Sequence, residues 1–184
     1  MIYGDIAIRS ALKRGYITGE NLEALVNPAS LNIRLGSTFL TPKTDRIVML
    51  GDPVEYDAHT VEPGHRFRVG PGQFVLGTTL ERLDLPSRIS AFVQGRSSIG
   101  RIGLTIQNAG FVDPGFHGHI TLELINESPN PIFLAPGYPI GQLVFFETGE
   151  VERPYDGKYN DQVEATGSRM YLDEWKEGVI DARG

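Results

Sequence analysis

The segment GHITLELIN, residues 118–126, alternates in the way that an amphipathic β-strand requires. One face of this strand is apolar and carries Ile120, Leu122 and Leu124. The other face is mixed and carries His119, Thr121, Glu123 and Ile125. Carboxylates are depleted at strand centres, and a charge that is removed from water needs a partner. Glu123 is therefore expected either to pair with an arginine inside the sheet or to serve as an acid/base group whose proton affinity is raised.

Similar runs of β-forming residues recur along the chain, at 31–35, 65–69, 73–80, 89–95, 103–108, 119–126, 130–134 and 140–147. The segments between them are turn-forming and hold most of the 22 glycines and 12 prolines. Many short strands at close spacing predict a sandwich, jelly roll or barrel rather than βαβ units. Two helical pieces are expected before the strands, at 5–14 with Asp5 as the N-cap, and at 21–26.

Length and composition restrict the class of protein. A chain of 184 residues fits one domain that can bury a core of its own. The net charge of -6 argues against general affinity for nucleic acid, and no apolar run approaches the ~18 residues that a membrane span needs. The N-terminus shows no signal-peptide pattern, and the absence of cysteine removes disulfides and thiolate zinc sites and fits a cytoplasmic protein.

The segment GRSSIGRIG, residues 95–103, is a candidate anion site. Ser97 and Ser98 are expected to cap a helix N-terminus, where free N–H groups favour an anion. Arg96 and Arg101 carry the planar guanidinium that matches phosphate oxygens. The alternative is a serine-capped turn with two surface arginines, and the spacing of a Walker loop is absent.

The segment NAGFVDPGFHG, residues 108–118, contains a second group of candidates. Asp113 precedes Pro114 and Gly115, where an aspartate commonly opens a turn. His117 and His119 share one face of the following strand, but no third metal ligand stands nearby in the sequence. Surface or partly buried histidines are therefore expected rather than a metal site.

The block from residue 91 to 147, with GRSSIGRIGLTIQNAGFVDPGFHGHITLELIN at its centre, resembles the dCTP deaminases, the deaminating branch of the trimeric dUTPase superfamily. The resemblance extends to four further segments: SLNIRLG at 30–36, APGYPIGQLVFFE at 135–147, VERPYDGKYNDQ at 151–162 and TGSR at 166–169. In the first of these, Asn32 stands where the family usually has aspartate. The resemblance implies an all-β, distorted jelly-roll or barrel fold of the dUTPase-like type, with short helices at the N-terminus and after strand 91–95. It also implies a homotrimer with active sites at subunit boundaries, and a β domain at 1–150 with a C-terminal arm at 151–184 that closes over the nucleotide. From composition alone, the same tail is either a solvated extension or an arm that orders over a ligand.

The resemblance also implies roles for individual residues. Glu123 corresponds to the general acid/base, and Asp113 meets the deoxyribose and the reacting water. The segment that grips phosphate and orients water comprises Arg96, Ser97, Ser98, Ile99, Gly100 and Arg101, of which Ser97 and Arg101 count as catalytic. The remaining substrate contacts implied are Ala109, Thr121, Leu122, Gln142, Tyr155, Lys158 and Gln162, with Tyr159 beside them.

The activity implied is hydrolytic deamination of dCTP in pyrimidine deoxynucleotide metabolism. Ala109, Gly110 and Phe111 ahead of Asp113 resemble the bifunctional type, which also cleaves dUTP to dUMP and pyrophosphate, because Gly110 leaves room for water near the α-phosphate. Mg²⁺ is expected on the triphosphate rather than in a protein cage, without zinc, and dTTP is a candidate inhibitor. No nucleic-acid or membrane partner is expected.

Three alternatives remain open from the sequence. One is a monofunctional dCTP deaminase that releases dUTP. Another is a dUTPase only, against which stand GRSS in place of GRSG and ITLELIN in place of an RGE-containing strand. The third is a non-catalytic nucleotide-binding jelly-roll module, which would not need Glu123 together with Arg101 and the Lys158 arm.

Overall fold

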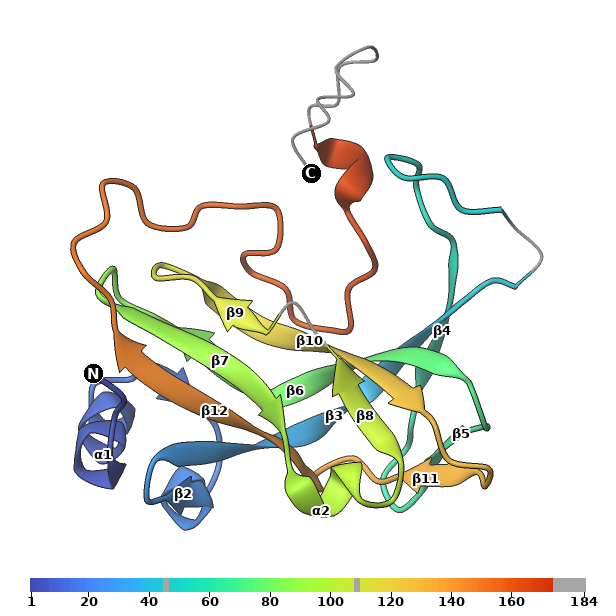
Figure 1. The fold of residues 1–184 in the computed structure, drawn as a ribbon, viewed down its shortest axis with the longest axis horizontal. Helices are drawn as coiled ribbons and strands as arrows, with labels where there is room; N and C mark the ends of the chain where they lie inside the picture. The colour runs from blue at the N-terminus through green and yellow to red at the C-terminus, as the bar shows by residue number, and fades with distance from the viewer. Residues whose placement is uncertain (45–46, 108–109, 174–184) are drawn as a thin grey trace.

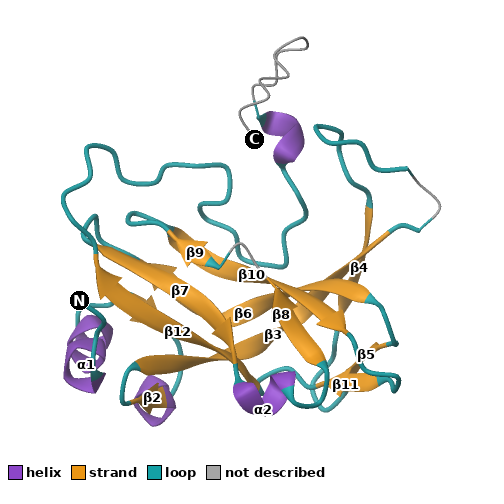
Figure 2. Cartoon of the chain, in the orientation of Figure 1, coloured by secondary structure: helices purple, strands orange, loops and turns teal. Residues whose placement is uncertain are grey.

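Strands dominate the computed structural model, which describes residues 1–44, 47–107 and 110–173. They form a strongly curled antiparallel sheet of ten strands, with a separate two-stranded sheet beside it (Figures 1 and 2). The strands of the large sheet are β1 (Ile17–Thr18), β2 (Val26–Asn27), β3 (Ser30–Pro42), β4 (Tyr56–Thr60), β6 (Phe74–Asp84), β7 (Ile89–Gly95), β8 (Leu104–Gln107), β9 (Phe111–Val112), β10 (His117–Asn126) and β12 (Pro139–Glu147). The small sheet pairs β5 (Phe67–Val69) with β11 (Ile132–Leu134). The expected all-β class with a curled sheet is confirmed.

Each of the eight runs expected to form strands does so, and β3 and β6 extend beyond their predicted ends. The two-residue strands β1 and β2, and the strands β4 and β9, were not expected. The burial of β4 does not alternate, because four of its five residues are exposed, and β9 has only two residues. Neither strand therefore carries the alternation on which a sequence-based prediction depends.

The helices are short: α1 (Asp5–Lys13), the 3₁₀ helices η1 (Leu22–Leu25) and η2 (Met170–Leu172), and α2 (Ser97–Gly100). The prediction that Asp5 caps α1 is wrong, because Gly4 is the extended N-cap residue and Asp5 is the first helical one. The helix expected after strand 91–95 is present as α2. Its serines do not cap it, however, since Arg96 is the N-cap and no side chain bonds the helix start.

The long strand β3 belongs to both halves of the curled sheet. Its residues 31–34 pair with β12, whereas the part from Leu35 onward pairs with β6 and β4. Gly36 lies at this transition, where an added Cβ would come 2.4 Å from Thr78 Cγ2. Only glycine allows the two strands to approach so closely, so β3 can cross from one half to the other.

A buried ion pair fixes the same transition. Glu81 is fully buried in β6, and its carboxylate accepts two hydrogen bonds from Arg34, at 2.7 Å from Nε and 2.7 Å from the main-chain nitrogen. A further Arg34 nitrogen donates to the carbonyl of Glu20 at 2.6 Å. The carboxylate–arginine pair that the sequence suggested for Glu123 is therefore formed by Glu81.

Strand β10 lies between β8 and β6 and has the alternation expected from its sequence. Ile120, Leu122 and Leu124 are buried, while Thr121 and Glu123 on the opposite face are partly exposed. The apolar face belongs to the single core of the domain, so Glu123 necessarily points to the other side.

After β12 the chain crosses back over the sheet as an arm with little regular structure (Figure 1). Main-chain hydrogen bonds dock it on the start of β10: Asp161 N–H donates to the His117 carbonyl, and His119 N–H donates to the Gln162 carbonyl, both at 2.8 Å. Farther along, Ala165 N–H donates to Thr38 Oγ1 at 3.0 Å. In the described part of the chain, no helix is both long and apolar enough to cross a membrane.

We expect Arg34→Met to reduce the free energy of unfolding by about 3–5 kcal/mol, because it leaves the fully buried Glu81 carboxylate without its guanidinium. Urea denaturation of the purified protein measures this loss. Arg88→Met is the matched control, since its ion pair with Glu150 is exposed on both sides and should cost at most about 1 kcal/mol. Equal losses in the two variants would show that the buried pair does not stabilise the strand transition.

Candidate active site

A cavity of about 490 Å³ lies between β9, the exposed face of β10 and the arm. Apolar side chains make much of its wall, and polar groups interrupt it at a few points. The lining comprises Tyr56, Phe74, Leu76, Val93, Gly110, Phe111, Val112, Asp113, Phe116, Ile120, Thr121, Glu123, Tyr155, Tyr159, Gln162, Thr166, Gly167 and Ser168. Apolar walls with a few convergent polar groups are typical of a small-molecule site.

Glu123 is the acidic group at the centre of β10. It lies opposite Leu76 of β6 and opposite Gln107 of β8 in the strand register. Burial raises the pKa of its carboxyl above the usual value, because the charged form loses water. No hydrogen bond or ion pair to another described residue lowers the pKa of this carboxyl, which stays partly exposed. Such a carboxyl is suited to accept and return a proton near neutral pH.

Asp113 follows β9 and faces the same cavity. Its carbonyl accepts the N–H of Phe116 at 3.2 Å, so the turn expected from the sequence is present. Asp113 is exposed and lines the cavity, and its carboxylate makes no hydrogen bond with another described residue. Gly110 and Phe111 also line the cavity, and the Gly110 carbonyl accepts the N–H of Val93 at 2.8 Å. Ala109 lies outside the described residues.

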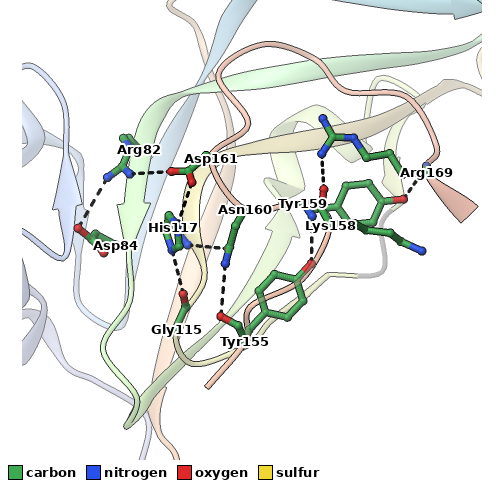
Figure 3. A network of polar contacts seen from close by, with 10 residues as sticks. All are labelled: Arg82, Asp84, Gly115, His117, Tyr155, Lys158, Tyr159, Asn160, Asp161 and Arg169. Carbon is green, nitrogen blue, oxygen red and sulfur yellow. Dashed lines mark hydrogen bonds and ion pairs between the residues drawn. The ribbon is translucent and has the colours of Figure 1, made fainter. Parts of the chain in front are cut away.

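The arm brings two of its expected site residues, Tyr155 and Gln162, to the cavity, together with Tyr159. The Tyr155 hydroxyl accepts the N–H of Tyr159 at 3.3 Å, which joins the two tyrosines. Lys158 is not in the lining: its ammonium pairs with Asp173 and lies 5.7 Å from the centroid of the Tyr159 ring. Figure 3 shows Lys158, Tyr155 and Tyr159 with the neighbouring arm residues.

Polar side chains of β6 and β10 hold the arm at its docking point (Figure 3). Asp161 Oδ2 lies 3.2 Å from His117 Nε2, and Asp161 Oδ1 lies 3.8 Å from Arg82. His117 and His119 are partly buried, as expected, and His119 Nδ1 lies 3.0 Å from the Thr79 carbonyl. Within the described ranges, no group of three or more histidine, aspartate or glutamate side chains could hold a metal ion.

The expected phosphate-gripping segment is not part of this cavity. Strand β8 begins at Leu104, which pairs with Asn126, and ends at Gln107, which pairs with Glu123. Helix α2 precedes the start of β8 and lies at the edge of the sheet away from the arm (Figure 1). Ser97, Ser98, Gly100 and Arg101 are exposed there. Arg96 donates to the Pro139 carbonyl at 2.9 Å, and the side chain of Ile99 is buried in the core.

Two further residues with expected substrate contacts also lie elsewhere. Gln142 in β12 is outside the lining, and its Oε1 accepts the Ser30 hydroxyl at 3.2 Å. The side chain of Leu122 is fully buried on the core face of β10, so only its main chain can border a ligand on the opposite face.

The lining also contains residues to which the sequence assigned no role. The hydroxyl of Tyr56, in β4, accepts the N–H of Ser168 at 3.2 Å and so joins β4 to the arm at the wall of the cavity. Thr166 and Ser168 belong to the TGSR motif of the arm, which was noted only as a motif. Tyr56 had no usable signal, because its strand does not alternate.

The charge of the cavity is one-sided. Glu123 and Asp113 are acidic, and over the described residues no lysine or arginine lines the cavity. The exposed Arg101 lies at the remote edge with α2. The cavity of one chain therefore has acid/base groups without the cations that a phosphorylated ligand requires.

The fold has a counterpart among solved structures. The 2'-deoxycytidine 5'-triphosphate deaminase of Agrobacterium tumefaciens has a TM-score of 0.63 and 26% sequence identity, with 80% of this chain covered and 48% of that chain. A sequence model described as dCTP deaminase-like matches residues 2–148. The chain belongs to the dCTP deaminase-like family, and the resemblance found in the sequence is confirmed.

Curated relatives are similar to this protein over almost the whole chain. A protein of Sulfurihydrogenibium sp. (strain YO3AOP1) is 42% identical over 178 residues, which is 94% of this chain and 99% of the relative. A protein of Aquifex aeolicus (strain VF5) is 41% identical over 176 residues, or 95% and 97% of the two chains. Both are named dCTP deaminase, dUMP-forming.

We expect Glu123→Gln to raise the melting temperature by up to a few degrees at about pH 8, and the gain to shrink at about pH 4.5. Because the pKa of Glu123 is higher in the folded state than in the unfolded one, stability falls as the pH rises from the unfolded pKa to the folded pKa. The glutamine side chain of the variant carries no charge, so the variant does not undergo this loss of stability. Calorimetry at both pH values measures the difference in melting temperature between the variant and the wild type.

Glu62→Gln makes the same change of charge at an exposed loop position and should show no such pH-dependent gain. A Glu123→Gln protein that is less stable than the wild type at about pH 8, or a gain shared by both variants, would contradict the account of Glu123 as an uncompensated carboxyl.

Proposed function

We propose that this protein hydrolyses dCTP to dUTP and ammonia, and then hydrolyses dUTP to dUMP and pyrophosphate in the same site. The single observation that carries the proposal is Glu123: a partly dehydrated carboxyl of raised pKa, with no partner among the described residues, on the wall of a mainly apolar cavity. Membership of the dCTP deaminase-like family and the names of relatives at about 40% identity support the same assignment.

In the first reaction Glu123 acts as general base and then as general acid. It accepts a proton from the water that adds to C4 of the cytosine, and it returns a proton to N3 of the ring. The proton of the new C4 hydroxyl then passes to the amino group, the C4–N bond breaks, and ammonia leaves, which gives the C4 carbonyl of uracil. The strand holds the carboxyl beside Leu76, so the group stays poorly hydrated and retains the proton affinity that both transfers need.

In the second reaction Asp113 orients a water molecule toward the α-phosphate. Its carboxylate is exposed in the cavity, next to a segment whose Gly110 has no side chain to occupy the space that water needs. The water adds to the α-phosphorus, the bond to the β-phosphate oxygen breaks, and pyrophosphate leaves. dUMP and pyrophosphate are the products.

The wider assignments follow from the same proposal. Mg²⁺ would arrive on the triphosphate, where it neutralises charge and makes pyrophosphate a better leaving group. Asp113 is a hard oxygen donor at the cavity, which suits that ion, although no described group of residues forms a metal cage. We place the reaction in the cytoplasm, and dTTP would compete for the same pocket.

The wild-type protein, incubated with dCTP and Mg²⁺, should release ammonia, dUMP and pyrophosphate in equal amounts, with little free dUTP. Ion-exchange chromatography and an ammonia assay measure the products. Glu123→Gln should lower ammonia release by at least about 10³-fold while it still binds dCTP, because the amide cannot transfer a proton. Accumulation of dUTP one-for-one with ammonia would indicate a monofunctional deaminase. A protein that releases no ammonia from dCTP but cleaves dUTP supplied in a parallel reaction would be a dUTPase only.

We also propose that the protein acts as a homotrimer in which α2 of one subunit completes the cavity of the next. The cavity of one chain has two carboxylates and no described cation, whereas Ser97, Ser98 and Arg101 are exposed at a remote edge of the same chain. A head-to-tail contact between different surfaces closes into a ring when its rotation is 120°, so one contact repeated three times completes three sites.

A mixture of two inactive subunits tests the shared site. Glu123→Gln and Arg101→Gln should each be inactive alone, and their co-refolded 1:1 mixture should recover roughly a quarter of wild-type activity, because only sites with one intact half from each subunit work. The double variant, mixed with itself, is the control. Absence of recovery in a mixture that sediments as a trimer would rule out a site shared between subunits.

A further inference from the structure

The hydroxyl of Thr121 lies at a junction between β10 and the arm. It accepts the N–H of Thr166 at 3.0 Å and lies 3.3 Å from Gln162 Oε1. The main-chain nitrogen can only donate, so the single proton of the hydroxyl remains free for the Gln162 carbonyl oxygen. Thr121 therefore contacts two different parts of the arm through one oxygen atom.

The position of Gln162 is fixed by main-chain contacts. Its carbonyl accepts the N–H of His119 at 2.8 Å, and its side chain is only 8% exposed. Gly118 faces this point with φ of +140°, and a Cβ there would lie 3.1 Å from the Gln162 nitrogen. The arm thus approaches β10 as closely as a glycine permits.

The orientation of the Gln162 amide, in contrast, is not fixed by the main chain. An amide can rotate by half a turn and exchange its acceptor oxygen for its donor nitrogen. The Thr121 hydroxyl engages the oxygen, and Nε2 has no hydrogen-bond partner among the described residues although Gln162 lines the cavity. In this orientation the amide presents the donor Nε2 to the cavity. After rotation by half a turn it would present the acceptor Oε1 instead.

We propose that Thr121 is a positioning residue, which turns the Gln162 amide so that Nε2 donates to a hydrogen-bond acceptor of the bound nucleotide. This inference rests on the proposed function for the identity of the ligand. Thr121 acts through Gln162 and not by a direct contact of its hydroxyl with the nucleotide. The part of its effect that passes through Gln162 must therefore disappear when the amide is absent, which leaves only the contact with Thr166 N–H.

A double-mutant cycle between Thr121→Val and Gln162→Leu tests this dependence. We expect Thr121→Val to lower kcat/KM for dCTP about tenfold in the wild-type background, and less than about twofold in the Gln162→Leu background. The same cycle is measured on the dissociation constant of the α,β-imido analogue of dUTP, which requires no turnover. Equal effects of Thr121→Val in both backgrounds would overturn the proposal, because they would show that Thr121 acts on the nucleotide directly or on the fold.

Two matched variants separate orientation of the amide from simple docking of the arm. Thr121→Ser keeps the hydroxyl and should recover activity to within about threefold of the wild type. Thr38→Val removes the hydroxyl that accepts Ala165 N–H at 3.0 Å, so it loses an equivalent arm contact without touching Gln162. A loss in Thr38→Val as large as that in Thr121→Val would also overturn the proposal.

The two proposals fail in different ways. If wild-type protein releases no ammonia from dCTP, the deaminase assignment fails, while the cycle on analogue binding still decides the role of Thr121. If the wild type releases ammonia and the cycle is additive on both readouts, the assignment of Thr121 alone fails.

Discussion

The ion pair between Arg34 and Glu81 holds the strand that joins the two halves of the sheet. Arg34 is the last residue of β3 that pairs with β12, and its neighbour Leu35 is the first that pairs with β6. The guanidinium and the main-chain nitrogen of Arg34 both bind Glu81 of β6, at 2.7 Å each. β6 in turn carries β10 on its other edge, so the position of Glu123 in space depends on this contact with the fully buried Glu81.

Glu81 and Glu123 are both removed from water to some extent, but among the described residues only Glu81 has a partner that compensates its charge. Glu81 is surrounded by donors and stabilises the sheet, whereas the Glu123 carboxyl loses water and has no described partner that offsets the loss. A nearby arginine would lower the pKa of Glu123 and reduce its ability to return a proton at neutral pH. Among the described residues of one chain, no lysine or arginine that lines the cavity has this effect on Glu123. The cost is a small loss of stability at a functional site, which is common in enzymes.

Much of the fold is predictable from local pattern. The alternation of residues 118–126 predicts both β10 and the side on which Glu123 lies, because the side-chain period of a strand is two. β4 escapes such a prediction, since an exposed edge strand needs no alternating core contact. The pairing of Arg34 with Glu81 is also invisible locally, because the two residues are 47 positions apart and meet only through sheet register.

The site was predictable in part for the same reason. Glu123, Thr121, Asp113, Gly110 and Phe111 line one cavity, and they lie in or next to strands with clear patterns or in a motif of the family. The arm residues Tyr155 and Gln162 also reach it, but Lys158 does not, because its ammonium is paired with Asp173. The serines of α2 were expected to cap a helix. They occupy its first turn instead, since the chain enters the helix through an extended Arg96. Which residue becomes the N-cap of a helix depends on backbone angles, and composition does not determine these angles.

The docking of the arm on β10 through main-chain hydrogen bonds has a consequence for the thermodynamics of ligand binding. Bonds at His117, His119 and Thr121 hold residues 161–166 through contacts within the chain itself. Hydrogen bonds of the chain itself therefore offset part of the conformational entropy that this segment loses when it is ordered. A ligand that meets a preordered wall binds with a smaller entropic penalty than one that must first order a loose segment.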